Sequence, residues 1–384
     1  MKRRGIILLF AAGCALCFAG VGVPSELSEA AKDGALNQVP KEWLTQENLV
    51  RGDKDGVTPL HLAARNGHLD QIPAAFLTPQ NLALKNRQGF TPLQLAAGNG
   101  HLDQIPRKLL TTENLTTGKN GGLTAFHYAS QNGHLDQIPA ELLTSANLTL
   151  KDGEGATPLH YAAENGHLDQ VPRELLTQAN LTLQNNDGLT PLHLAARRGH
   201  LDQIPGPLLT RNNLTIKGKN GETALRSALQ FRLDQIPEEV LTQEDLTFQG
   251  KDVATPLHHA AAQGHLDHIP RKFLTQENLT LPDNNGATPI QWAAVNGHLD
   301  QIPPELLTQA NLARKDEEGD TCFHVAAVGG HLNQIPVKLL TKENLSRPNE
   351  AGVTPLHAAA ENDHLDQIPQ PVLLDPECQA LIGK

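Results

Sequence analysis

The sequence repeats itself with a period of 33 residues, and this period restricts the chain to folds that stack many similar layers. A Thr-Pro-Leu-His-like tetrad marks each repeat. Its threonine stands at Thr58, Thr91, Thr124, Thr157, Thr190, Thr223, Thr255, Thr288, Thr321 and Thr354. Every step is 33 residues except one of 32, between Thr223 and Thr255. Residues 25–57 match the middle of the pattern without its tetrad, so we predict eleven repeats over residues 25–384.

The composition fits many thin layers better than a few large domains. Hydrophobic residues make up 39% of the chain, too many for a disordered polymer, but aromatic residues make up only 3%. Alanine and leucine therefore have to build most of the core. The formal net charge is −11, so the chain lacks the basic surface that holds a phosphate backbone, and nucleic acid is not expected as a partner.

The repeat that starts at Thr157 shows the expected local structure. Thr157 can cap a helix through its hydroxyl, and Pro158 takes the first helical position, where a missing N–H costs nothing. An Ala-Ala pair at residues 162–163 leaves a narrow helix face on which a neighbouring repeat can pack closely. Gly166 ends the helix because glycine tolerates positive φ. Residues 181–188 predict a short extended piece that enters a turn.

A 33-residue period with the pattern Thr-Pro-Leu-His-x-Ala-Ala resembles the ankyrin repeat, and the resemblance covers residues 25–384. It implies an all-α, ankyrin-like helical-repeat solenoid with short β-turn hairpins between the repeats. It also implies a protein partner, held on a concave face by the first helices and the turn tips, with no cofactor. We expect a monomer in which residues 25–57 and 354–384 are terminal caps around residues 58–353.

The second half of each repeat departs from the usual ankyrin pattern, in which the second helix runs unbroken. A proline such as Pro106 interrupts it in every repeat, and a proline inside a helix costs about 3 kcal/mol. We predict that Leu-Asp-Gln-Ile forms a short helical turn and that the helix restarts near the proline. The following Thr-x-x-Asn-Leu segment is expected to form one further capped turn.

Eighteen histidines raise the question of a metal site or a catalytic site, but sixteen of them recur at two positions of the repeat. In the ankyrin family such histidines hydrogen-bond the backbone, so we interpret them as structural. His258, His259, His265 and His268 form the one local cluster, and they leave a zinc-dependent enzyme as a remote alternative. The cluster has no cysteine and no His-Glu-x-x-His spacing, so we predict neither a metal nor catalysis. Six Asn-Leu-Thr/Ser sequons also share one repeat position, where the asparagine is expected to cap a turn: Asn114, Asn147, Asn180, Asn213, Asn278 and Asn344.

Function is expected where the repeats differ from one another. The position after the tetrad varies, and it holds both tyrosines and one of the two tryptophans of the chain. Polar residues near the end of the first helix vary as well. We predict a partner-binding face that contains Tyr128, Tyr161, Trp292, His259, Arg65, Glu164, Arg197 and Arg198. In the alternative interpretation, the three rings only pack between neighbouring first helices.

The repeat at residues 223–254 is irregular. Its sequence TALRSALQFRLDQIP lacks the Gly-His pair and one residue, and Val253 replaces the glycine that is expected before Thr255. Sequence drift explains this irregularity, but a hinge or a specialised contact site is the sharper hypothesis. A broken layer weakens the coupling between nearest neighbours in a repeat array.

Residues 1–24 form a leader ahead of the repeats. Lys2, Arg3 and Arg4 precede an apolar run over residues 5–23, which is the pattern of an export signal. Three interpretations stay open: a cleaved signal, lipidation at Cys14, and an uncleaved membrane anchor. All three place the repeats outside the cytoplasm, in the periplasm, the cell envelope or the medium. We therefore predict an exported, non-catalytic scaffold for protein–protein recognition, with a structural spacer or anchored envelope scaffold as the alternative.

Overall fold

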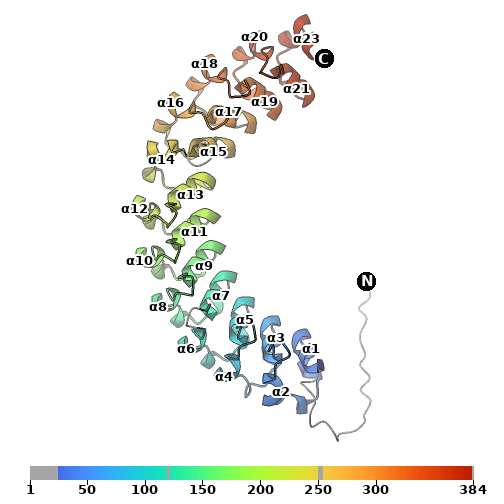
Figure 1. Ribbon diagram of the computed structural model, residues 1–384, viewed down its shortest axis with the longest axis vertical. Coiled ribbons are helices and arrows are strands. Elements are labelled where there is room, and N and C mark those ends of the chain that lie inside the picture. Colours follow the sequence, from blue (N-terminus) through green and yellow to red (C-terminus); the bar gives the residue numbers. More distant parts are fainter. Residues whose placement is uncertain (1–24, 119–121, 250–253, 383–384) are drawn as a thin grey trace. The chain divides into compact units, whose positions relative to one another are not determined.

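The computed structural model describes residues 25–118, 122–249 and 254–382, and every element in these ranges is helical (Figure 1). The predicted all-α array of repeats is confirmed. The predicted hairpins are not, because turns without strands join the repeats in these ranges. Internal contacts divide the chain into two compact units, Met1–Leu143 and Thr144–Lys384, which we call the N-terminal block and the C-terminal block. The leader, with Cys14, lies outside the described residues.

Each repeat opens with a short α-helix that the tetrad starts. Thr58 caps the helix of its repeat and accepts a hydrogen bond from the backbone N–H of His61, while Pro59 is the first helical residue. Gly67 ends the helix with φ of 78°, a left-handed conformation that favours glycine. The first helices are α1 (Ser25–Asp33), α3 (Pro59–Asn66), α5 (Pro92–Asn99), α7 (Ala125–Asn132), α9 (Pro158–Asn165), α11 (Pro191–Arg198), α13 (Ala224–Phe231), α15 (Pro256–Gln263), α17 (Pro289–Asn296), α19 (Cys322–Gly329) and α21 (Pro355–Glu361).

The first helices of successive repeats pack side by side within each block, and their small residues form the core (Figure 1). On α3, for example, Leu60, Ala63 and Ala64 are fully buried. Alanines at the contact allow close approach of the helices, as the low aromatic content predicts. No helix in the described ranges is both long enough and apolar enough to cross a bilayer.

The second half of a repeat is a series of single helical turns, as the prolines predict. In repeat 91–123 a 3₁₀ turn over Leu102–Gln104 comes first, and the chain is extended at Ile105 and Pro106. A second 3₁₀ turn over Arg107–Leu109 follows Pro106, and Thr111 then caps the α-turn α6. The Leu-x-Gln-type 3₁₀ turns are η1 (Leu36–Gln38), η3 (Leu69–Gln71), η4 (Leu102–Gln104), η6 (Leu135–Gln137), η8 (Leu168–Gln170), η10 (Leu201–Gln203), η12 (Leu233–Gln235), η14 (Leu266–His268), η16 (Leu299–Gln301), η18 (Leu332–Gln334) and η20 (Leu365–Gln367). The 3₁₀ turns after the proline are η2 (Lys41–Trp43), η5 (Arg107–Leu109), η7 (Ala140–Leu142), η9 (Arg173–Leu175), η11 (Gly206–Leu208), η13 (Glu238–Val240), η15 (Arg271–Phe273), η17 (Pro304–Leu306) and η19 (Val337–Leu339). The remaining α-helical pieces are α2 (Gln46–Val50), α4 (Pro79–Leu82), α6 (Thr112–Leu115), α8 (Ser145–Leu148), α10 (Gln178–Leu181), α12 (Arg211–Leu214), α14 (Gln243–Thr247), α16 (Gln276–Leu279), α18 (Gln309–Leu312), α20 (Lys342–Leu345), α22 (Gln370–Leu373) and α23 (Pro376–Ile382).

A glutamine clamp joins several of these repeats to the repeat before. The Gln104 side chain accepts a hydrogen bond from the Leu69 backbone N–H at 2.8 Å and donates one to the Gly67 carbonyl at 2.8 Å. Both partners are backbone groups that the short turns leave without an intrahelical partner. The clamp recurs at Gln71, Gln137, Gln203, Gln235, Gln301 and Gln334.

The sequon asparagines also have a structural role in this fold. The Asn278 side chain donates to the Phe273 carbonyl at 2.8 Å, and the residue is 1% exposed. The cap itself is Thr275, whose hydroxyl accepts from the Asn278 backbone N–H. The asparagine therefore joins the second 3₁₀ turn to the α-turn, and its nitrogen is not free to carry a glycan in the folded protein.

Candidate functional site

The tetrad histidines fix the first helices and leave little chemistry to perform. Nδ1 of His61 lies 3.2 Å from the Thr58 backbone N–H donor, and Nε2 lies 3.1 Å from the carbonyl oxygen of Phe90, the last residue of the same repeat. A carbonyl can only accept, so Nε2 carries the proton and Nδ1 accepts. Burial lowers the pKa of His61, which keeps the ring neutral. This geometry supports the structural interpretation of these histidines.

A pocket of about 420 Å³ opens on the first-helix face of the N-terminal block, the face made by the first helices and the turns before them. Its walls come from α3, α5 and α7 and from the turns that precede α3 and α5. Two predicted residues, Arg65 on α3 and Tyr128 on α7, line the same pocket. We call it the Arg65–Tyr128 pocket.

An aromatic pair forms one wall of this pocket. The rings of Phe90 and Tyr128 are tilted by 48°, with their centroids 5.7 Å apart. Gly98 lies between Arg65 and Tyr128 along the face, and a Cβ atom there would lie 3.4 Å from Cβ of Tyr128. The absence of a side chain at this position therefore keeps the pocket open.

The charge of the lining comes from a single side chain. Arg65 is exposed, and it is the only formally charged residue among those that line the pocket, because His61 is neutral. Burial raises the pKa of Tyr128, so its hydroxyl stays protonated at neutral pH. The arrangement can hold an apolar side chain against the rings and can donate hydrogen bonds to an acceptor at Arg65.

The other two predicted rings brace the turns that come just before their own first helices, at the end of the preceding repeat. The Tyr161 hydroxyl donates to the Asp152 carboxylate at 2.8 Å, and the Trp292 indole N–H donates to Asp283 at 3.0 Å. Burial first, and then the hydrogen bond to Asp152, raise the pKa of Tyr161. The Trp292 ring also makes an edge contact with the His259 ring, with centroids 5.7 Å apart. These contacts favour packing over binding for Tyr161 and Trp292.

The predicted charged residues of the C-terminal block already have ion-pair partners within the chain. Arg198 lies 2.9 Å from the Glu164 carboxylate of the preceding repeat, and Arg197 lies 2.8 Å from Glu222. All four side chains keep substantial contact with water, so each pair adds little stability. The eight predicted residues therefore do not form one continuous site. Arg65 and Tyr128 share a pocket in the N-terminal block, and the other six lie in the C-terminal block.

Two pocket residues were missed by the sequence analysis, Phe90 and Gly98. Phe90 directly precedes the tetrad that begins at Thr91. Aliphatic or polar residues occupy this position in the other repeats, so the aromatic ring at residue 90 could have been recognised as a signal. Gly98 stands where Arg65, Glu164 and Arg197 stand in other repeats. The sequence pattern alone does not show that these two unusual residues, which lie in different repeats, both lie beside Tyr128.

The irregular repeat has a set of contacts of its own. Asp245 replaces the usual asparagine and cannot donate to a carbonyl, but Arg211 of the preceding repeat donates to the Val240 carbonyl at 3.0 Å and pairs with Asp245. The Arg226 guanidinium lies over the exposed Phe248 ring, 3.8 Å from its centroid. At the next junction His268 stands where other repeats have the clamp glutamine, and the described residues give it no hydrogen bond to the preceding repeat.

The histidine cluster splits into separate contacts. His258 bonds to Thr255 and to the Ala287 carbonyl, whereas the rings of His265 and His268 contact each other at 5.8 Å. In the described part of the chain, no group of three or more His, Cys, Asp or Glu side chains is arranged to hold a metal ion.

Comparison with known families agrees with this architecture. The family described as ankyrin repeats (3 copies) matches residues 27–111, 74–143, 106–176, 137–204, 238–303 and 301–369. The matches cover most of the chain, so the protein belongs to the ankyrin-repeat family, whose members generally mediate protein–protein interaction and are typically non-catalytic. They leave residues 205–237 uncovered, a range that includes the start of the irregular repeat. A search of curated proteins found no match.

Proposed function

We propose that this protein is a non-catalytic recognition scaffold that binds a protein partner on the first-helix face of its N-terminal block. The Arg65–Tyr128 pocket is the observation that carries the proposal. It combines an aromatic wall, a glycine that keeps the hollow open and one arginine, Arg65, that forms no ion pair among the described residues. Aromatic and arginine side chains are the usual anchors of protein interfaces.

The proposed partner contact is local, and the protein acts as a monomer. Tyr161, Trp292 and the pairs of Glu164, Arg197 and Arg198 already have partners inside the chain. They stabilise the array that presents the pocket. The leader pattern of residues 1–24 supports a place outside the cytoplasm, either secreted or attached to the cell envelope.

A structural spacer is the second candidate, and the glutamine clamps favour it. The clamps recur at several junctions of both blocks, and each clamp gives its repeat two directed hydrogen bonds to the preceding one. A regular array of this kind serves as a rigid extension even without a partner.

Partner capture from the source cell's envelope and medium separates the two candidates. The bait is the whole chain, compared with a double variant, Arg65→Ala with Tyr128→Ala. A matched control changes Lys108→Ala and Trp43→Ala, a cation and an aromatic residue in the second halves of repeats of the same block. We expect a protein that the wild type and the control retain and the double variant loses, with the folding of all three verified by circular dichroism. Retention by all three contradicts the proposed site, and capture by none supports the spacer.

A further inference from the structure

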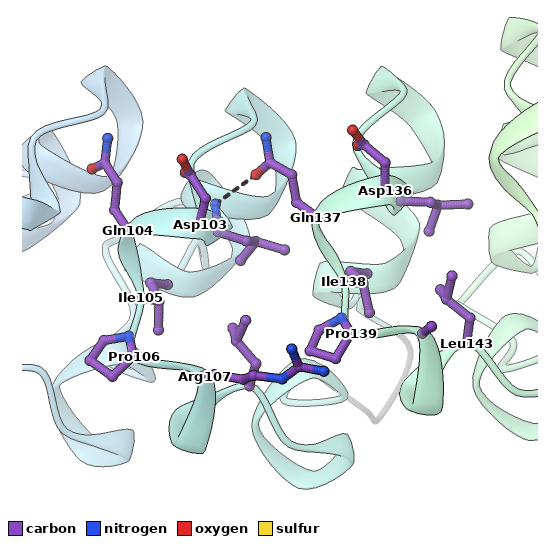
Figure 2. Close-up of a pocket in the computed structure, with 14 residues that line it drawn as sticks. Asp103, Gln104, Ile105, Pro106, Arg107, Asp136, Gln137, Ile138, Pro139 and Leu143 are labelled. Carbon is purple, nitrogen blue, oxygen red and sulfur yellow. Dashed lines mark hydrogen bonds between the residues drawn. The ribbon is translucent and has the colours of Figure 1, made fainter.

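A second hollow lies between the second halves of two successive repeats and shares no residue with the Arg65–Tyr128 pocket. It is a shallow groove of about 810 Å³ between repeats 91–123 and 124–156. Figure 2 shows Asp103 and Asp136 toward one end, with Ile105, Ile138 and the prolines lower down and Arg107 at the other end. We call it the Ile-Pro groove.

The groove recurs at a second junction. A second groove, of about 380 Å³, occupies the same positions of the pattern in the C-terminal block, between repeats 157–189 and 190–222. In this second groove Asp169 and Asp202 are equivalent to Asp103 and Asp136 of the first. Val171 and Ile204 are equivalent to the two isoleucines.

The proline of each repeat creates this groove. Ile105 has φ −91° and ψ 130°, and Pro106 has φ −50° and ψ 124°, so the chain is extended between two 3₁₀ turns. Two such extended stretches lie side by side in neighbouring repeats (Figure 2). At these two junctions the interrupted helix therefore leaves a groove with an aliphatic and proline floor between neighbouring repeats.

The carboxylates at the acidic end of the groove form no ion pair with any residue that the structure describes. Asp70, Asp103 and Asp136 are exposed, and none of them has an ion pair among the described residues. The opposite end does contain a cation: the Arg107 guanidinium lies 3.0 Å from the Glu141 carboxylate of the next repeat. The chain thus shows that an arginine can bridge two repeats here, and Arg271 with Glu305 repeats the contact in the C-terminal block.

We propose that the Ile-Pro grooves bind an extended, cationic segment of a partner protein, one lysine or arginine side chain to each repeat. The aliphatic stem of such a side chain can pack on the isoleucine and proline floor while its charged end reaches the aspartate. A purely apolar segment would leave the aspartates without compensation, and an acidic one would be repelled by a chain of net charge −11.

The repeat spacing specifies the spacing of those cations. Neighbouring first helices pack side by side, at about 8–10 Å between axes. A polyproline II segment rises about 3.1 Å per residue with three residues per turn, so every third side chain returns to the same face after about 9 Å. The matching partner therefore has its cations at every third residue.

The test uses a labelled peptide of four Lys-Pro-Pro triplets and the whole chain, with affinity measured by fluorescence anisotropy. An isomeric peptide with its four lysines adjacent has the same composition and charge but the wrong spacing. We expect the spaced peptide to bind about tenfold more tightly than the isomer, which corresponds to ~1.4 kcal/mol.

Two variants identify the surface. The first replaces aspartate by asparagine at the four aspartates that line the two grooves and at three exposed aspartates at the same repeat position: Asp103, Asp136, Asp169 and Asp202, with Asp70, Asp300 and Asp366. It is expected to fold, because Asn37 and Asn333 already occupy this position in 3₁₀ turns of the same kind. The matched control removes the same charge elsewhere by glutamate-to-glutamine changes at Glu42, Glu47, Glu113, Glu174, Glu238, Glu239 and Glu277.

The preference for the spaced peptide should disappear in the aspartate variant and persist in the glutamate control. Equal binding of the two peptides to the wild type, no binding of either, or a preference that survives in the aspartate variant would overturn the proposal. None of these results bears on the Arg65–Tyr128 pocket, which contains none of the substituted residues.

Discussion

Removal of one glutamine clamp is expected to destabilise the array far more than the loss of a surface side chain. The change Gln104→Met keeps the length of the side chain and removes both of its hydrogen bonds. The Leu69 N–H and the Gly67 carbonyl then lose partners that lie at 2.8 Å in the folded protein. Leu69 is fully buried, so water cannot easily replace the side chain there.

The magnitude follows from the two orphaned groups. A buried backbone group that loses its hydrogen-bond partner costs about 1–3 kcal/mol of stability. Gly67 is only half-buried, so its carbonyl contributes toward the lower end of this range. The sum for Gln104→Met is therefore about 2–4 kcal/mol. Methionine adds no charge and fits irregular space, so packing changes should contribute little.

Urea unfolding measures this loss through the midpoint at constant slope, and hydrogen exchange of the Leu69 amide measures it locally. The local measurement matters because long repeat arrays can depart from two-state unfolding. Gln80→Met is the control, since Gln80 is exposed on α4. A loss below about 0.5 kcal/mol, within the range of ordinary surface changes, together with an unchanged Leu69 amide, would refute the reasoning.

Three further outcomes test other parts of the structure. Burial lowers the pKa of four tetrad histidines, His61, His193, His258 and His324, in the folded protein. The unfolded chain therefore binds more protons than the folded one as the pH falls through the ordinary histidine pKa of 6.5, and the melting temperature should fall between about pH 7.5 and about pH 5. A melting temperature that does not change over this range would contradict the reasoning. Tyr161→Phe removes only the hydroxyl that donates to Asp152, so urea unfolding should show a loss of about 0.5–1.5 kcal/mol. The Leu201 amide donates to the clamp residue Gln235, whereas the equivalent Leu233 amide faces the position of His268. Hydrogen exchange should therefore be faster at Leu233 than at Leu201, and His268→Gln should slow the exchange at Leu233. Equal exchange of the two amides in the wild type would contradict the hinge hypothesis.

Much of this fold could be predicted because each local signal recurs in register. A threonine before Pro59 and a glycine at Gly67 define a helix of known length, and the structure places both as predicted. The prolines correctly predicted that the second half of a repeat is broken into turns. The predicted extended piece over residues 181–188 was less accurate, because Leu181 is the last residue of α10 and the turn closes without a strand.

The candidate site was harder to predict because its contacts run between repeats. Tyr128 stood out as an aromatic residue, but the pocket depends on Phe90 from one repeat and Gly98 from another. The bracing of Tyr161 and Trp292 did have a signal, since Asp152 and Asp283 each stand nine residues upstream of the ring. The same upstream aspartate also occurs at Asp53, where the partner position holds Leu62, so the pattern alone does not identify the contact.

The irregular repeat shows why contacts across repeats matter more than the pattern within one. Asp245 breaks the asparagine pattern, yet Arg211 supplies the lost donor to the Val240 carbonyl. A hydrogen bond within the repeat is thus replaced by one from the preceding repeat. His268 breaks the clamp pattern, and the described residues supply no substitute donor or acceptor for the preceding turn. Two substitutions that look equally disruptive in the sequence therefore differ in their expected effect. The first leaves neighbouring layers coupled, and the second makes the junction after residue 254 the place where this array should open most easily.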